Sequence, residues 1–161
     1  MAKILEILRE VFGPMKHELE DPFELLVATI LSQNTSDVNS RRAFERLKAA
    51  VGELTPKVLA SLAEGEIAQH IKCSGLANIK AKRIKEASRR ILEELGGDLS
   101  KVLEGGVEEA RAFLTSLPGV GSKTADVVLA FGKGAPVVPV DTHLFTLAKR
   151  LGISDARTYE G

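Results

Sequence analysis

A lysine and an aspartate in the C-terminal third of the chain could together carry out covalent chemistry. Lys123 follows the turn Pro118-Gly119-Val120-Gly121, and the run Asp141-Thr142-His143 begins eighteen residues after that lysine. The N-terminus of a helix disfavours an ammonium group nearby, and partial burial of the side chain would add to this effect. A neutral amine is a nucleophile, and a carboxylate can stabilise positive charge that develops during a reaction. The two residues therefore indicate covalent chemistry by an amine.

The turn before Lys123 has the composition of an anion-binding helix start. Pro118 ends the preceding helix, while Gly119 and Gly121 permit positive φ and remove side chains that would block close approach. The backbone N–H groups of Gly121, Ser122 and Lys123 would then lie at the positive end of a helix, where they can hold a phosphate. An ordinary tight turn between two helices is the alternative. A nucleotide P-loop does not fit, because a serine separates Gly121 from Lys123 and a helix, not a strand, precedes the turn.

Three other residues with reactive side chains also have ordinary structural interpretations. Asp141 is suited to cap a helix that begins at Thr142, and this role does not exclude catalysis. For His143 we favour a structural hydrogen bond over proton transfer. Cys73 is the single cysteine, so the chain holds no internal disulfide and no metal site built from several of its own thiolates. We expect it to be a small, buried, apolar side chain.

The composition is that of a folded protein without a global attraction to polyanions. The chain has 161 residues, of which 44% are hydrophobic, and its formal net charge is zero. Anion binding must therefore come from local features. No apolar run is long enough for a membrane span and no signal peptide is recognisable, so we expect a soluble intracellular protein. Few Asn and Gln among many Lys, Arg and Glu indicate a source from a hot environment.

Apolar residues recur at helical spacing almost throughout the chain, which predicts about nine or ten short helices. Asp21-Pro22 and Thr55-Pro56 are helix start signals. Residues 22–33 are apolar nearly all round, which predicts a helix buried in the middle of the fold. A long helix over 79–95 should end at the glycines that follow it. Only residues 137–140 could form a strand, and their proline argues against one. The predicted fold is all-α.

Three segments, in this order, resemble the endonuclease III family of helix–hairpin–helix DNA glycosylases. DPFELLVATILSQNTSD (21–37) resembles the buried helix of the family and the loop behind it, and GLANIKAKRI (75–84) resembles a second DNA-contacting loop. LPGVGSKTA (117–125), followed by VDTH (140–143), is similar to the helix–hairpin–helix and the Gly/Pro-rich loop. The similarity runs over about residues 20–153 and is of an archaeal or thermophilic type.

The resemblance implies two helical lobes. A six-helix barrel lobe would occupy residues 21–133, with the helix–hairpin–helix at about 108–131, and residues 1–20 and 134–161 would belong to the second lobe. The family commonly carries a [4Fe-4S] cluster on four cysteines, which this sequence lacks, so we expect no cofactor in this chain. We further expect the second lobe to be incomplete, and to be completed by a missing C-terminal segment or by a partner chain. The apolar side chains that would then be exposed are Leu144, Leu147 and Leu151.

The resemblance also implies a bifunctional base-excision-repair enzyme, a DNA N-glycosylase with AP lyase activity. Its partner would be double-stranded DNA with a damaged base or an abasic site, most commonly an oxidised pyrimidine, and its location the cytoplasm, at the nucleoid. Lys123 would attack the sugar C1′ and form a Schiff base, while Asp141 stabilises the cationic sugar. A non-catalytic helix–hairpin–helix module that binds only the DNA backbone is the alternative, and it would need neither side chain.

Base flipping leaves a gap in the stack that side chains must fill. By resemblance Leu76 is the apolar wedge, with a core leucine as the alternative. Either Gln33 or Asn34 would enter the stack from the other loop, since many family members carry glutamine where this chain has Asn34. Lys80 and Lys82 flank the wedge loop within a basic run that is either a phosphate-binding or a solvated face. We expect a monovalent cation on the hairpin carbonyls. The further residues expected to contact DNA are Gly119, Gly121, Ser122, Thr124 and His143.

Overall fold

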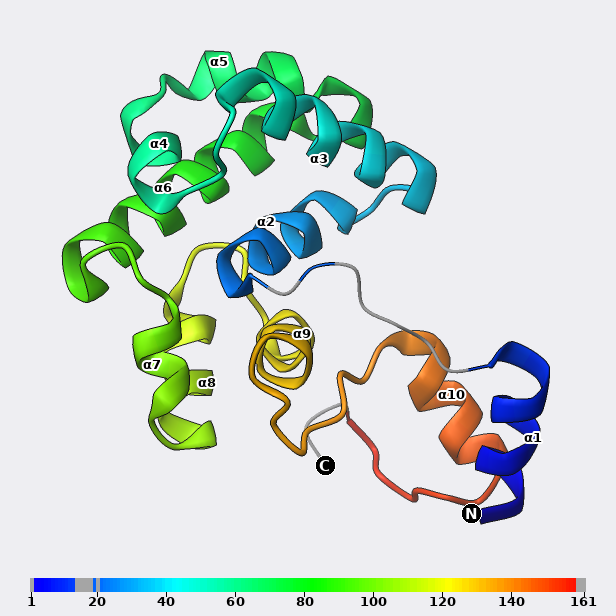
Figure 1. The fold of residues 1–161 in the computed structure, drawn as a ribbon. Helices are drawn as coiled ribbons and strands as arrows, with labels where there is room; N and C mark the ends of the chain where they lie inside the picture. The colour runs from blue at the N-terminus through cyan, green and yellow to red at the C-terminus, as the bar shows by residue number, and fades with distance from the viewer. Residues whose placement is uncertain (1, 14–18, 20, 159–161) are drawn as a thin grey trace. The chain divides into compact units, whose positions relative to one another are not determined.

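The structure is a computed structural model that describes residues 2–13, 19 and 21–158. Within these ranges the chain forms ten α-helices and one short 3-10 helix, and no strand (Figure 1). The all-α prediction is confirmed, and residues 137–140 are indeed not a strand. Across the described ranges no helix has both the length and the hydropathy needed to cross a membrane.

Two compact units divide the chain. Leu19–Pro139 forms the larger unit, and Met1–Glu18 together with Val140–Gly161 forms the smaller one. The smaller unit contains helices α1 (Ala2–Phe12) and α10 (Thr142–Arg150). The assignment of these parts to a barrel lobe and a second family lobe stays a prediction.

The larger unit consists of short helices with one long helix among them. The short helix α7 was not predicted from the sequence, whereas the long helix α6 was. The bounds are α2 (Pro22–Ser32), α3 (Asp37–Val51), α4 (Pro56–Ser61), α5 (Glu64–His70), η1 (Lys72–Ser74), α6 (Ala77–Leu95), α7 (Ser100–Glu104), α8 (Val107–Ser116) and α9 (Ser122–Lys133).

The helix boundaries follow from local chemistry that is readable in the sequence. Asp21 caps α2, since its Oδ1 accepts the Glu24 N–H at 2.8 Å, and Pro22 takes the first helical position. Thr55 caps α4 in the same way, again with a proline in the first turn. Gly96 ends α6 in the left-handed conformation, with φ 69°. The predicted start and stop signals at these positions are confirmed.

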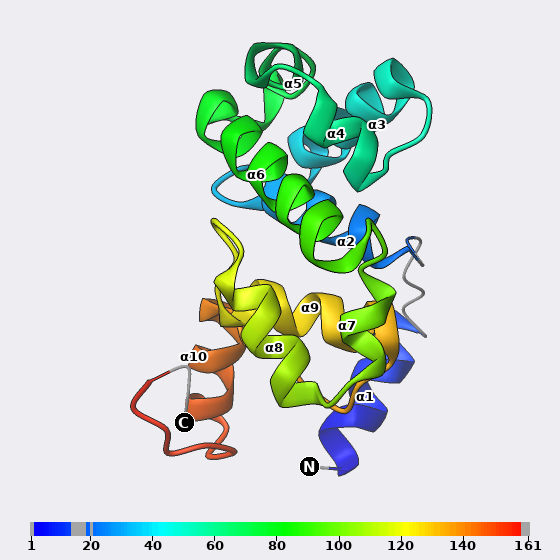
Figure 2. The same ribbon diagram turned by 90° about the vertical axis from the view of Figure 1, so that its left-hand side faces the viewer.

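Helix α2 is the centre of the larger unit, as its apolar sequence predicted. It packs against α3, α6 and α9, and both views show it between α6 and α9 (Figures 1 and 2). Most of its side chains are buried, among them Leu26, Ile30 and Leu31. Gly132 of α9 comes so close to α2 that an added Cβ would lie 3.3 Å from Pro22. Packing in the core therefore fixes the position of α2. The loop that begins at Gln33 is held in place with it.

Helices α8 and α9 form the hairpin. The Arg111 guanidinium of α8 donates through Nε to Asp126 Oδ1 of α9 at 3.0 Å and through Nη1 to Glu108 Oε1 at 2.7 Å. The hydrogen bond to Asp126 is the main reason that the pKa of Arg111 is raised. Leu117 and Val120 are buried beneath the turn. The hairpin is thus held both by an ion pair and by packing.

Apolar side chains lie exposed on both helices of the smaller unit. On α1 these include Leu5, Leu8 and Phe12. On α10 and just after it, Leu144, Leu147 and Leu151 are exposed, as predicted.

Candidate active site and DNA-contacting loops

The turn between α8 and α9 leaves a helix start without a side-chain cap. The Val120 N–H donates to the Leu117 carbonyl at 3.1 Å, and the first bond into α9 runs from the Ala125 N–H to the Gly121 carbonyl at 3.0 Å. Among the described residues no side chain caps α9, and the N–H groups of residues 121–123 have no hydrogen-bond partner. Such N–H groups at the positive end of a helix can bind an anion.

The two glycines of this turn differ in conformation, although glycine permits positive φ at both positions. Gly119 has φ +80°, and an added Cβ would lie 2.4 Å from Arg83 Cδ, so conformation and packing both require glycine. Gly121 has φ −93°, which any residue can adopt. A Cβ there would meet nothing within 4 Å among the described atoms. The protein's own packing does not require glycine at 121, whereas close approach of an external ligand would.

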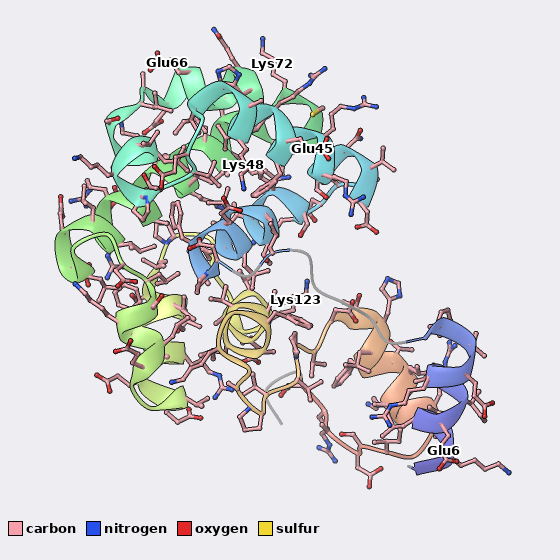
Figure 3. The ribbon with its side chains drawn as sticks, viewed as in Figure 1. Glu6, Glu45, Lys48, Glu66, Lys72 and Lys123 are labelled. Carbon is pink, nitrogen blue, oxygen red and sulfur yellow. The ribbon has the colours of Figure 1, made fainter. Side chains whose placement is uncertain are left out.

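Lys123 is the second residue of α9, and its side chain is exposed (Figure 3). The partial burial that we expected is not observed. Its Nζ makes no hydrogen bond or ion pair with the described residues. Of the two predicted features of this site, a helix N-terminus and partial burial, the structure shows only the helix N-terminus.

Asp141 belongs to the smaller unit and Lys123 to the larger one. Asp141 caps α10, because its Oδ1 accepts the Leu144 N–H at 2.7 Å. The predicted capping role is confirmed, and it occupies one carboxylate oxygen. His143 is exposed and forms no hydrogen bond with the described residues, so the structural hydrogen bond that we favoured for it is not seen.

Two non-glycine residues of the described chain have positive φ, and both are candidates for insertion into DNA. Asn34 has φ 52° and Leu76 has φ 49°. A side chain in this conformation costs free energy, so the surrounding structure must enforce it. Leu76 is 53% exposed, which rules out the alternative of a core leucine. Both loops therefore present a strained residue at the surface.

The structure separates the roles of Gln33 and Asn34, which the sequence left open. Gln33 Nε2 donates to the Gly119 carbonyl at 2.9 Å, and Gln33 Oε1 accepts from Arg83 Nη1 at 3.2 Å. Gln33 thus joins the end of α2 to the hairpin turn. Asn34 is exposed, and its side chain forms no hydrogen bond with the described residues. Asn34 is therefore the residue available to enter the stack.

Two residues predicted to contact DNA have side chains that are not available to it. Lys80 is 1% exposed, and its Nζ donates to the carbonyls of Leu31 and Ser74, each at 2.7 Å. Burial, and next the nearby charge of Arg83, lower the pKa of Lys80. A phosphate contact by Lys80 is therefore wrong. The side chain of Thr124 is also buried, at 5% exposure, because it faces the core side of α9.

Most of the remaining basic run on α6 is engaged by neighbouring groups. Lys85 donates to the Leu62 carbonyl at 2.5 Å. Two arginines pair with glutamates of their own helix: Arg89 with Glu86 and Glu93, and Arg90 with Glu94. Lys82 is exposed and its ammonium forms no hydrogen bond or salt bridge with the described residues, so it stays a candidate for a phosphate contact.

The interior position of Lys80 was missed, although helical spacing could have revealed it. The buried stripe of α6 includes Ile84, Ala87 and Ile91. Lys80 lies four, seven and eleven residues before these positions, and so on the same face of the helix. A lysine on an apolar stripe predicts either a buried cation with partners or a break in the stripe. In this protein Lys80 is a buried cation with partners.

The residues present do not fit a cluster held by four cysteines. Cys73 is the single cysteine of the sequence, and it is half-buried with its thiol directed at the Asn39 carbonyl, 3.7 Å away. The described ranges contain no group of three or more His, Cys, Asp or Glu side chains placed to hold a metal ion.

Comparison with known proteins places this arrangement in a family. Residues 27–161 match the model of the HhH-GPD superfamily of base excision DNA repair proteins. The chain is 39% identical to endonuclease III of Thermotoga maritima over 98% of its own length and 70% of that protein. Two solved structures, a non-covalent endonuclease III–DNA complex and a trapped endonuclease III–DNA covalent intermediate, each superpose with a TM-score of 0.80 at 30% identity, covering 98% of this chain and 70% of the other.

The chain belongs to the endonuclease III family of the HhH-GPD superfamily. It is a base-excision-repair DNA glycosylase with AP lyase activity, as the resemblance implied.

Proposed function

We propose that Lys123 is the nucleophile and Asp141 the stabilising carboxylate of this activity, with Gly121 and Ser122 contacting a DNA phosphate. The observation that carries the proposal is the start of α9, where an exposed lysine stands beside N–H groups without partners. The open space at Gly121 supports it, because a glycine that the protein's packing does not require leaves room for a backbone to approach.

In the proposed reaction the neutral Nζ of Lys123 attacks C1′ of the damaged nucleotide. The bond from C1′ to the base breaks, and the base leaves with the electron pair and takes up a proton. The nitrogen then loses a proton, the bond from C1′ to O4′ breaks as the C1′=N double bond of a protonated Schiff base forms, and O4′ takes up a proton. Removal of a proton from C2′ expels the 3′ phosphate, which cuts the strand. Asp141 stabilises the positive charge that develops on the sugar as the base departs.

We propose oxidised pyrimidines in double-stranded DNA as the substrates, at the nucleoid of the cytoplasm. Leu76 and Asn34 are the residues that would replace the flipped nucleotide, and Lys82 would contact a phosphate nearby. The exposure of both wedge candidates and their positive φ values support these roles. A monovalent cation on the hairpin carbonyls stays a prediction.

Borohydride trapping on DNA with an abasic site tests the assignment of Lys123. The wild-type protein should form a covalent adduct, and Lys123→Ala should form none. Lys57→Ala is the matched control, because Lys57 is also an exposed lysine at the second position of a helix, α4. An adduct that persists in Lys123→Ala would falsify the role of Lys123. DNA binding without any wild-type adduct would favour the backbone-binding module instead.

Two substitutions at Asp141 separate catalysis from capping. Asn is as good a helix cap as Asp, so Asp141→Asn should keep α10 intact while it removes the negative charge. We expect a loss of base excision of about a hundredfold or more, on the scale of other electrostatic catalytic groups. Asp141→Ala should lose both activity and part of the stability. Full activity in Asp141→Asn would leave capping as the sole role of this side chain.

A further inference from the structure

Lys80 joins the two loops that carry the wedge candidates. Its ammonium donates to Leu31 O, in the last turn of α2, and to Ser74 O, at the end of η1. Asn34 follows Leu31 by three residues, and Leu76 follows Ser74 by two. We propose that Lys80 is a positioning residue that holds these two loops at a fixed separation, so that Asn34 and Leu76 enter the DNA stack together.

The chemistry of the two carbonyls explains why a cation lies between them. The last carbonyls of a helix lack partners within the helix and carry partial negative charge. Leu31 O and Ser74 O are such groups, and one ammonium satisfies both. No other side-chain donor among the described residues reaches either oxygen. Substitution by an apolar side chain of similar length would leave two buried acceptors without a donor.

The loops held by Lys80 are also the loops that carry backbone strain. A left-handed side chain persists where the structure around it fixes the backbone on both sides. Lys80 fixes the chain just before each strained residue, Asn34 and Leu76. A second connection acts on the first loop, since Gln33 bonds to the hairpin at Gly119 and to Arg83. The two wedge loops are thereby joined by Lys80 of α6, and the first of them is joined to the hairpin turn by Gln33, which Arg83 of α6 also contacts.

Another lysine of α6 is the natural comparison. Lys85 also donates to a backbone carbonyl, that of Leu62, and its loop contains no strained residue. Loss of Lys85 should therefore affect stability without affecting wedge insertion. Lys80 is buried and does not touch DNA, so its effect on the reaction must pass through the loops that it holds.

The experiment compares single-turnover base excision on two duplexes. In one the lesion is fully paired, and in the other it lies opposite a gap, so that less unstacking is required. On the paired duplex, Lys80→Met should lower the excision rate by about tenfold or more, because misplaced groups reduce a reaction rate steeply. On the duplex with the gap, the excision rate should fall by less than about threefold, because less unstacking is required. Lys85→Met should match the wild type on both. An equal loss of Lys80→Met on both duplexes, or no loss on either, overturns the proposal.

A cycle with Leu76→Ala tests the route of the effect. If Lys80 acts through the wedge, Lys80→Met should slow excision of the paired lesion far less in the Leu76→Ala background than in the wild-type background. Full additivity contradicts the proposal. If Lys80→Met does not fold, Lys80→Gln replaces it, because glutamine keeps a hydrogen-bond donor. The same outcomes then support or contradict the proposal.

This inference rests on the proposed function, but the two can fail separately. Borohydride trapping of Lys80→Met on DNA whose abasic site lies opposite a gap should stay at the wild-type level. If Lys80→Met is trapped normally but loses excision equally on both duplexes, the role of Lys80 alone is contradicted. If the wild type forms no trapped adduct, the role of Lys123 is contradicted.

Discussion

The segments Gly75–Ala81 and Gly119–Ala125 look alike in sequence and differ in structure. Each has a glycine of positive φ, then the start of a helix, then a lysine in the first turn and an alanine packed in the core. Lys80 points inward and binds two carbonyls, whereas Lys123 points outward and binds nothing in the described chain. The same residue type in nearly the same place therefore supports the scaffold in one segment and, as we propose, carries out the chemistry in the other.

A difference of one position accounts for this. Lys80 is the fifth residue after its glycine, Gly75, and Lys123 is the fourth after Gly119. One residue on a helix turns the side chain by about 100°, which is enough to move it from the core face to the solvent face. Ile79, the counterpart of Lys123, is accordingly exposed, and Thr124, the counterpart of Lys80, is buried. Register along the helix, and not composition, decides the role of each lysine.

The largest expected effect concerns the outward lysine. Lys123→Gln should reduce strand cleavage by about a thousandfold or more, because it removes the nucleophile. Its free energy of unfolding should change by less than about 0.5 kcal/mol, since the side chain is exposed without contacts. Cleavage assays on abasic DNA, together with urea unfolding, check both parts. A strongly destabilised variant would mean that Lys123 has a structural role after all.

The two turn glycines should respond in opposite ways to alanine. Gly119→Ala should lower the free energy of unfolding by about 2 kcal/mol, because the backbone is left-handed and Arg83 must move. Gly121→Ala should keep the stability of the wild type and weaken DNA binding at least about tenfold, because a methyl group would stand where the phosphate approaches. Thermal unfolding and DNA titrations measure the pair. Unchanged DNA affinity in Gly121→Ala would remove the evidence for close approach at this glycine.

The inward lysine should contribute more to stability than its partner on the same helix. Lys80→Met should lower the free energy of unfolding by about 1 to 3 kcal/mol, the cost of two carbonyls without donors less the cost of burying a cation. Lys85→Met loses one partly exposed hydrogen bond and should cost less. Denaturant unfolding of both variants provides the comparison, and a larger loss in Lys85→Met would contradict our account of α6.

The smallest expected effect is a pH dependence at Lys80. Because its pKa is lowered in the folded protein, the folded state gives up this proton at a lower pH than the unfolded chain does. The unfolded chain then binds more protons, so stability rises as the pH increases through the folded pKa towards the ordinary lysine value. The stability difference between the wild type and Lys80→Met should therefore grow as the pH rises towards the ordinary lysine value. A difference that shrinks over this range would contradict the sign of the shift.

Local signals in the sequence predicted most of the fold. Asp21, Thr55 and Gly96 mark helix ends by chemistry that acts within a few residues, and the apolar run of α2 predicts a central helix because no polar face remains. The hairpin between α8 and α9 was also located from the sequence, and the assignment of the two wedge loops stays a prediction. These features depend on neighbouring residues, which is why they are readable without a structure.

The contacts that the sequence did not predict join distant segments. The bond from Gln33 to the Gly119 carbonyl spans 86 residues, and that from Lys80 to Leu31 spans 49. Both depend on how helices pack, which spacing along one helix cannot show. For the same reason Gln33 and Asn34 could not be told apart, and the different conformations of Gly119 and Gly121 could not be predicted.

At Leu76, the left-handed backbone favours glycine for stability, whereas the proposed insertion into DNA requires a large apolar side chain. Glycine would relieve the strain at this position and expose less apolar surface, so Leu76→Gly would tend to make the folded protein more heat-resistant. The same exchange would delete the side chain that we propose to enter DNA. Screening a mutant library for thermal tolerance alone would therefore enrich repair-deficient molecules at this codon, and any stabilisation campaign should hold it constant.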